Sequence, residues 1–456
     1  MNAASHAAAS GKAAQQVVAA TDRYRALLER LDESPLAQLR RTAFEQFATT
    51  GFPTQRDEDW KYTNLRRLES RSFQPASTTL GAADESNLIA GTGVRIVLGN
   101  GQGNAGPSST SPLPPGVTIV SFRHWLEHDP GAAATFLQRH AAPHPSALEH
   151  LNTAFTDDGV VVEIAANTSF EQPIYIVHQW PGHMGQAASS AAPMSHPRII
   201  VRAGPNSHCT LIEHYLGPAE LESFTNTVVS LDLEAGAKVA HYRLQQESPR
   251  SFHVSTVRAR QQRDSHYTCH DIAFGASLAR TTMTTTLEGP GAAASLHGLF
   301  MPDGTRHLDT YTLVDHVAPN TISSEEYRGI ADGRGRGVFR GKVIVRPDAQ
   351  QIDSRQSSRN LLLSGGAEID SRPELEIYAN DVKCSHGATT GQLDAMSVFY
   401  LRSRGLSEQQ ARALLIRAFA ESILTSIGVS EVRNYLEQRL HERFAGEAVL
   451  SAGSSS

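Results

Sequence analysis

The fold class is decided by the segment VVSLDLEAGAKVAHYRLQQESPRSFHVSTVR (Val228–Arg258). It holds three short runs of β-branched or alternating apolar and polar residues, at Val228–Leu233, Val239–Leu244 and Val254–Arg258. The turn signal Glu234-Ala235-Gly236 separates the first two runs. Short runs with a period of two residues, bounded by turn residues, are typical of β-strands. The segment therefore predicts successive strands that are not separated by a crossover helix.

Similar runs extend this pattern on both sides, from about residue 156 to residue 379. Turn signals such as Asp303-Gly304 and Asp332-Gly333 recur among them, several at intervals of about 30 residues. So many short strands without helices are compatible with a sandwich, a barrel or a β-solenoid, and the loose period favours a solenoid. Further runs are Val160–Ile164, Ile174–His178, Arg198–Val201, Thr210–His214, Thr281–Leu287, Leu308–Val314, Gly337–Val345, Leu361–Leu363 and Glu374–Ala379.

Helical patterns flank this β region on both sides. Val17–Leu31 carries apolar residues on one helical face, and Ser34-Pro35 predicts the start of a second helix. Phe122–His128 and Ala132–His140 predict short helices in a mixed segment. Ser407 with Gln410 predicts a capping box, and a further helix follows from Ser430 to Gly446. We therefore expect a helical and mixed region at 1–155, a β core at 156–392 and a helical region at 393–456.

Composition and cysteine content narrow the class of protein. The 456-residue chain has a formal net charge of −6 and no basic run, so nothing predicts binding to nucleic acid or to an anionic membrane. The cysteines Cys209, Cys269 and Cys384 are odd in number and far apart, which favours free thiols in a reducing compartment. We find neither a secretory signal nor an apolar stretch of about 18 residues. These features predict a cytoplasmic protein.

The most distinctive chemistry lies in PELEIYANDVKCSHGATTG (Pro373–Gly391). Cys384 and His386 are two residues apart, so they share one face if the chain there is extended. A thiolate suits iron and iron–sulfur clusters, and an imidazole suits iron and zinc. The alternative is a buried structural cysteine beside a surface histidine. A single Cys and a single His cannot fill four ligand positions, so a cluster here needs ligands from elsewhere.

Other motifs are read as structural. In His266–His270 (HYTCH) the two histidines share a strand face and Cys269 points away, which disfavours a metal site. His208, Cys209 and His214 have no ligand spacing. Neither a phosphate loop, a Gly-x-Ser-x-Gly elbow nor a His-Glu-x-x-His motif occurs, so a self-contained nucleotide hydrolase, serine hydrolase or zinc protease is disfavoured.

Four segments together resemble one known family. DVKCSHGATTGQLD (Asp381–Asp394) and FYLRSRGLSEQQARALL (Phe399–Leu415) resemble the C-terminal region of the SufD scaffold proteins of the SUF iron–sulfur cluster assembly machine. RDEDWKYTNL (Arg56–Leu65) resembles the N-terminal signature of that family, and Arg340–Ser364 resembles its segment before the last strands. The related SufB proteins share the Tyr-Leu-x-Ser-Arg-Gly run but have a Glu-His-Glu-Ala-Thr type of sequence in place of the Cys-Ser-His run, so the resemblance is to SufD.

The resemblance implies a fold and an assembly. We expect a right-handed parallel β-helix with helical N- and C-terminal regions, in a non-enzymatic scaffold that pairs with SufB. ATP hydrolysis is expected in a SufC partner, bound by the C-terminal helical region. A homodimer is possible when the chain is alone. The residues implied for SufC docking are Tyr400, Leu401, Arg402, Ser403, Arg404 and Gly405.

The resemblance also implies the role of the cysteine and histidine. His386 and Cys384 are expected at the SufB–SufD interface, where a transient iron–sulfur cluster or iron is shared with the partner and none is held tightly by this chain alone. The alternatives are a SufB-like paralogue, a purely structural partner and, more remotely, a β-helix enzyme acting on carbohydrate, which would need a groove of paired acids that the sequence does not show.

Overall fold

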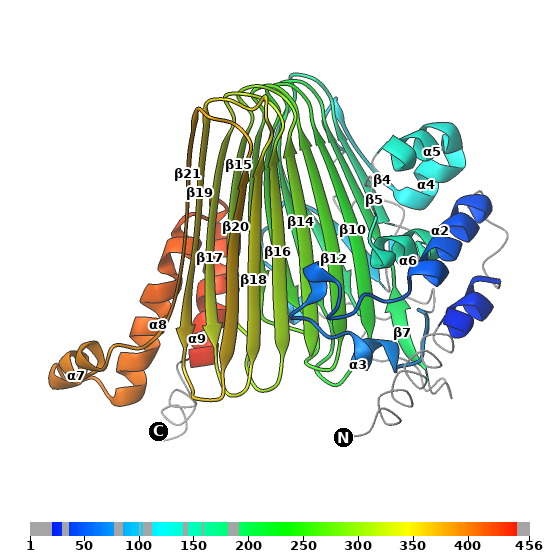
Figure 1. Ribbon diagram of the computed structural model, residues 1–456. Coiled ribbons are helices and arrows are strands. Elements are labelled where there is room, and N and C mark those ends of the chain that lie inside the picture. Colours follow the sequence, from blue (N-terminus) through cyan, green and yellow to red (C-terminus); the bar gives the residue numbers. More distant parts are fainter. Residues whose placement is uncertain are drawn as a thin grey trace, which may run out of the picture.

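The strands of the core alternate between two parallel sheets, as a computed structural model of the chain shows (Figure 1). The structure describes residues 21–29, 36–76, 85–99, 102–103, 112–139, 145–156, 159–180 and 191–444. Each strand of the core pairs with the second strand after it, so the chain winds as a solenoid with one strand from each sheet in every turn. The predicted parallel β-helix is confirmed.

Within the described residues, the first sheet has 11 strands and the second has 10. The first consists of β1 (Phe73–Pro75), β4 (Val117–Ser121), β5 (Gly159–Ile164), β7 (Ala192–Ser195), β8 (Arg198–Ala203), β10 (Phe224–Leu233), β12 (Phe252–Gln261), β14 (Leu278–Leu287), β16 (His307–His316), β18 (Arg336–Val345) and β20 (Glu368–Ile377). The second consists of β2 (Val94–Gly99), β3 (Gln102–Gly103), β6 (Ser169–Gln179), β9 (His208–Leu216), β11 (Lys238–Gln246), β13 (His266–Ala273), β15 (Ala293–Phe300), β17 (Ile322–Ala331), β19 (Ile352–Leu362) and β21 (Val382–Gln392).

The turn predicted at Glu234-Ala235-Gly236 is a corner between the two sheets. Gly236 has φ +71°, a left-handed conformation that glycine adopts without strain. A Cβ added there would also overlap the side chain of Asn206 in the preceding turn. Asn206 and Asp264 adopt a similar backbone at the neighbouring corners, so at Gly236 the close approach of the Asn206 side chain is what favours glycine.

Apolar side chains from the inner faces of both sheets form one continuous core between them. Val229, Val257, Met283 and Val314 are fully buried along successive strands of the first sheet. Burial of an aliphatic side chain of this size stabilises the fold by about 1.5–3 kcal/mol. Because each strand contributes such residues to the same core, the turns stabilise one another as neighbours in a row.

The interior also holds a group of buried charges. The Arg243 guanidinium donates to Asp271 at 2.7 Å and lies 3.5 Å from Glu213, whose other oxygen is 2.7 Å from His241 Nε2. All four side chains are almost fully buried. Buried charges persist only when they are paired and hydrogen-bonded, so the members of this group depend on one another.

Helices from the two ends of the chain cover the outer faces of the sheets. Residues 21–28 are helical, within the helix predicted at Val17–Leu31. Further N-terminal helices are α2 (Ala37–Thr50), α3 (Arg66–Glu69), α4 (Phe122–His128), α5 (Pro130–Arg139) and α6 (Ala147–Phe155), with short 3-10 turns η2 (Glu58–Trp60) and η3 (Glu85–Asn87). Phe44 and Phe47 of α2 and Leu148 of α6 pack in one cluster with Phe224 and Phe252 of the first sheet. The C-terminal helices are α7 (Ala395–Ser403), α8 (Glu408–Thr425) and α9 (Ser430–Phe444).

Helices α8 and α9 pack on the second sheet. Ile416 and Ile423 of α8, with Leu436 of α9, form a buried cluster with outward-facing residues of that sheet, such as Tyr242 and Ile272. The predicted capping box between Ser407 and Gln410 is present at the start of α8. The helical hairpin expected from the sequence is therefore docked on the solenoid.

The Arg56–Leu65 segment is clamped to the first sheet. Trp60 lies under the guanidinium of Arg280, 4.0 Å from the ring centroid, and the same guanidinium donates to the Asp59 carbonyl at 2.7 Å. Arg280 also pairs with the buried Asp309. These contacts explain why an aromatic residue stands among acidic residues in this segment.

Several expected helix boundaries were wrong or lie outside the described residues. Ser34-Pro35 and Gly446 fall outside them, and α2 has Leu36 at its N-cap position. Sequence reasoning missed α6, although its capping box of Ser146 and Glu149 was a readable signal. It also missed α7, whose apolar residues are largely exposed and form no buried face.

Candidate functional site

The solenoid ends in an uncovered turn. β20 and β21 stand at the ends of their sheets and have a strand neighbour on one side only among the described strands. β20 is mostly half-buried and β21 mostly exposed, unlike the buried strands that precede them. At the opposite end, the antiparallel strands β4 and β3 follow the parallel ones. An unpaired strand edge exposes a row of backbone donors and acceptors to another chain.

Cys384 and His386 lie on β21 in this last turn. The register is unbroken, and it sets Cys384 beside Ser354 and His386 beside Gln356 of β19. Val382 and Cys384 pack against the interior core, so alternation along the strand assigns His386 to the same inner face. Cys384 is half-buried and His386 is exposed. The structure thus brings the two predicted residues together at the open end of the core.

The segment before the pair is arranged differently from the sequence reading. Pro373–Ile377 belongs to β20 in the first sheet, whereas Cys384 and His386 belong to β21 in the second. Asn380 and Asp381 lie at the corner between the two sheets. Residues 374–379 therefore do not share a strand with the pair, although the two strands face each other across the core.

Only one of the three thiols is accessible to a ligand. Cys209 and Cys269 are 1% exposed, and burial raises the pKa of Cys209 to about 12 and that of Cys269 further. Burial, together with the nearby Asp353, raises the pKa of Cys384 more moderately. All three cysteines are free of disulfides. Cys384 is therefore the soft donor that an approaching metal ion or partner can reach.

The HYTCH segment has the strand geometry expected from the sequence. Cys269 points into the core, whereas His270 faces outward, donates to or accepts from Ser426 at 2.8 Å and stacks on His297. Burial lowers the pKa of His270 to about 3, so the ring is neutral at physiological pH. These side chains tie β13 to the end of α8.

No group of three or more His, Cys, Asp or Glu side chains suited to a metal ion occurs within the described parts of the chain. Cys384 and His386 supply two donors of types that iron accepts, a thiol and an imidazole. Iron in clusters is usually held by four protein ligands. This pair can therefore serve as part of a site whose remaining ligands come from another molecule.

The residues expected to dock a partner ATPase lie where α7 ends and the chain turns into α8. Tyr400, Leu401, Arg402 and Ser403 are in α7, and Arg404 and Gly405 form the turn. Met396, Phe399 and Tyr400 are 71%, 65% and 56% exposed. These three residues form what we call the α7 patch. The helix projects beyond the β21 edge (Figure 1) and has no buried residue.

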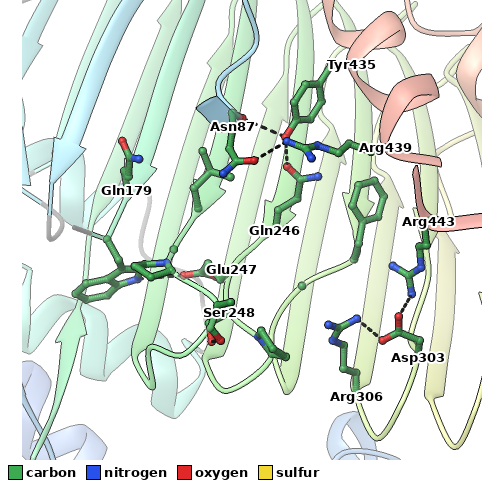
Figure 2. Close-up of a pocket in the computed structure, with 18 residues that line it drawn as sticks. Asn87, Gln179, Gln246, Glu247, Ser248, Asp303, Arg306, Tyr435, Arg439 and Arg443 are labelled. Atoms are coloured by element: carbon green, nitrogen blue, oxygen red, sulfur yellow. Dashed lines mark hydrogen bonds and ion pairs between the residues drawn. The ribbon is translucent and has the colours of Figure 1, made fainter. Parts of the chain in front are cut away.

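A separate cavity of about 560 Å³ lies between α9 and loops at the ends of the strands (Figure 2). Asp303 lies between Arg306 and Arg443, and Arg443 donates to it at 2.7 Å. The Tyr435 hydroxyl is 3.1 Å from the backbone oxygen of Asn87. Because these polar groups bind one another across the cavity, they attach α9 to the solenoid, and Cys384 and His386 are not among the lining residues.

The parallel β-solenoid, with helices packed on the outer faces of its two sheets, defines the class of fold. Two family models agree with this description: the SufBD core domain of SUF system FeS cluster assembly matches residues 183–419, and the SufBD protein N-terminal region matches residues 12–176. The chain belongs to the SufBD family of iron–sulfur cluster assembly proteins.

Relatives in three organisms support this membership. A SufBD family iron–sulfur cluster assembly protein of Synechocystis is 32% identical over 91% of this chain and 92% of its own length. The iron–sulfur cluster assembly protein SufD of Escherichia coli is 28% identical over 91% of this chain and 94% of its own. The chloroplastic protein ABCI7 of Arabidopsis thaliana is 28% identical over 88% and 84%. No described helix is long and apolar enough to span a membrane.

Proposed function

We propose that this chain is a SufD-type scaffold subunit, which pairs with a SufB-type subunit through its open last turn and helps assemble a nascent iron–sulfur cluster at the interface. The observation that carries this proposal is the position of Cys384 and His386 on the inner face of the uncovered strand β21. The cluster or iron is the cargo, and no part of it is held by this chain alone. ATP hydrolysis belongs to a SufC-type partner.

Strand geometry supports pairing through the last turn. β20 and β21 together offer 21 residues of strand edge, 10 in β20 and 11 in β21. Another parallel solenoid can continue both sheets by hydrogen-bonding to these edges. The same edges permit pairing of two copies of this chain, so we expect a homodimer when the SufB-type subunit is missing.

Donor chemistry supports a shared site. The half-buried Cys384 and the exposed His386 lie on one face of the edge strand, so a partner strand added beside β21 places its own inner-face residues on the next rung. Thiolate or carboxylate groups at those positions complete the coordination of iron. Covering the end also excludes water from the site, which protects a nascent cluster.

Iron retention by the purified complex tests this function. The chain is co-expressed with SufB and SufC proteins, and iron per complex is measured for wild type, Cys384→Ser, His386→Ala and the control Ser385→Ala. Ser385 lies between the two residues but faces outward, so its loss leaves the donors intact. We expect a large loss of iron for His386→Ala, a smaller loss for Cys384→Ser and none for the control. Equal iron content in all four complexes contradicts the proposal.

The α7 patch supports docking of the SufC-type ATPase. Apolar side chains this exposed on a helix without a buried face are typical of an interaction surface. Co-purification of SufC is measured for Phe399→Ala combined with Tyr400→Ala, and for the control Asn434→Ala at an exposed position of α9. We expect the double variant to lose SufC and to keep SufB. Undiminished SufC binding would place the docking surface elsewhere.

A further inference from the structure

His386 stands at the end of a file of polar side chains that continues into the core. The register places Glu325 of β17 beside Gln356 of β19, and Gln356 beside His386 of β21. On the side away from Gln356, the neighbour of Glu325 is the apolar Leu296 of β15. Leu296 thus separates these three polar residues from Cys269 and His241, which lie further along the same file.

Glu325 and Gln356 form a buried pair. Gln356 Nε2 donates to Glu325 Oε2 at 2.5 Å, and the two residues are 4% and 2% exposed. A Cβ added at Gly341 of β18 would overlap the Gln356 side-chain amide, so this glycine provides the space in which the amide lies. The pair is thus fixed by packing from the opposite sheet as well as by its hydrogen bond.

The other end of the Gln356 amide is unused. Its Oε1 atom is buried and has no hydrogen-bond partner within the described chain. A buried acceptor without a partner costs about 1–3 kcal/mol, so such atoms normally have one. Because Nε2 is turned to Glu325, Oε1 is turned away from it. The strand on that side is β21, about 4.8 Å away, and its residue beside Gln356 is His386.

We propose that Gln356, held in place by Glu325, accepts a hydrogen bond from one ring N–H of His386 and thereby fixes which imidazole nitrogen is free to bind iron. This inference rests on the proposed function, since it assigns the groups that orient a histidine of the shared site. A histidine that binds a metal through one nitrogen nearly always donates its other N–H to a fixed acceptor, which sets the tautomer and the ring orientation. Gln356 and Glu325 are positioning residues in this scheme.

A separate file lies beneath Cys384 and provides a matched control. Ser354 is beside Cys384, and its hydroxyl is 2.8 Å from that of Ser323, which is 2.9 Å from His316 Nε2. Ser354 is as deeply buried as Gln356 and lies on the same strand. Ser354→Ala therefore removes a buried polar group at the same depth without touching the file of His386.

The tautomer of His386 is measured in the full-length chain, with isotope-labelled histidine, by imidazole nitrogen NMR shifts at about pH 8, where an ordinary histidine is neutral. The His386 signals are identified by their loss in His386→Ala. We expect one tautomer in wild type and in Ser354→Ala, and a mixture in Gln356→Leu. A mixture already in wild type overturns the inference, and that result needs no variant that might misfold. An exchanged pair, Glu325→Gln with Gln356→Glu, keeps an acceptor beside His386 and is expected to retain one tautomer.

Iron binding separates failure of this inference from failure of the proposed function. In the complex with SufB and SufC, we expect Gln356→Leu to weaken ferrous iron binding roughly 10- to 100-fold, as loss of such supporting groups does elsewhere, and the exchanged pair to restore it. If His386→Ala abolishes iron binding while Gln356→Leu changes neither the tautomer nor the affinity, the inference is wrong and the function stands. If Gln356→Leu frees the tautomer while His386→Ala leaves iron binding intact, the contact is real and the function is wrong.

Discussion

Replacing Glu325 with glutamine should alter how the stability of this protein depends on pH. Burial raises the pKa of Glu325 from 4.5 to about 7, so the native state keeps this proton at pH values where the unfolded chain has lost it. The unfolded state therefore binds fewer protons between these two pKa values, and the free energy of unfolding contributed by Glu325 falls as pH rises through that window. Glutamine does not titrate, so this fall in the free energy of unfolding with rising pH is missing from the variant.

The size of the effect follows from the two pKa values. A shift of one unit corresponds to about 1.4 kcal/mol, and the part of the shift realised between about pH 5.5 and about pH 8 amounts to about 2 kcal/mol. Free energies of unfolding are measured by denaturant titration of wild type and Glu325→Gln at both pH values. We expect the variant to gain about 2 kcal/mol relative to wild type on going to the higher pH. Other titrating groups cancel in this difference.

The control is Glu326→Gln, which removes the next carboxyl group of β17. Burial acts to raise the pKa of Glu326, but hydrogen bonds from Arg328 and Ser422 lower it below 4.5 overall. The contribution of Glu326 to the free energy of unfolding is therefore the same at both pH values. Glu326→Gln should lower the free energy of unfolding by an equal amount at each. If Glu325→Gln likewise differs from wild type by the same amount at both pH values, Glu325 is ionised throughout and our account of the buried pair is wrong.

Three further predictions concern the fold. Burial lowers the pKa of His178 to about 4 and that of His196 to about 3. The unfolded chain takes up these protons at a higher pH than the native state, so each histidine should reduce the free energy of unfolding by roughly 2 kcal/mol at pH 5 relative to pH 8. Denaturant titrations should show this loss of stability, and equal stability at the two pH values would refute it. Arg280→Met should cost about 3–5 kcal/mol by leaving a buried carboxylate unpaired, and an unchanged melting temperature would contradict it. Gly298→Ala should cost about 1–3 kcal/mol by overlapping the Tyr327 ring, whereas the same substitution at the open Gly387 should be nearly neutral in thermal melts.

The repeated strand pattern was sufficient to predict a solenoid because every turn reuses the same chemistry. Residues such as Val239 and Tyr242 lie on the two faces of a strand, and Gly236 marks a corner with a left-handed backbone. Local signals of this kind also predicted the start of α8, where Ser407 and Gln410 bond to each other's backbone. Elements whose stability comes from distant contacts, such as the Trp60 segment, could be noticed in the sequence but not placed.

Only part of the candidate site could be predicted from the sequence, because its other residues are brought together by contacts between distant parts of the chain. The spacing of Cys384 and His386 predicts a shared face, and the structure has them on one face of β21. Glu325 and Gln356 were missed because they lie far from His386 in the chain, and only the strand register aligns the three. A weak signal existed: Ser354, Gln356, Ser358 and Asn360 are polar at the register positions that β15 fills with Ala294, Leu296, Gly298 and Phe300.

The uncovered last turn has a consequence for the amounts in which a cell makes this protein. Among the described strands, β20 and β21 each leave one edge open, and each edge is a template for the addition of an extended polypeptide, including a damaged or nascent chain. The ion pair between Lys342 of β18 and Glu376 of β20 joins these neighbouring strands but leaves the open edge of β20 unoccupied. Under the pairing that we propose, we expect synthesis in balance with the SufB-type subunit to keep these edges covered and to limit aggregation of surplus copies.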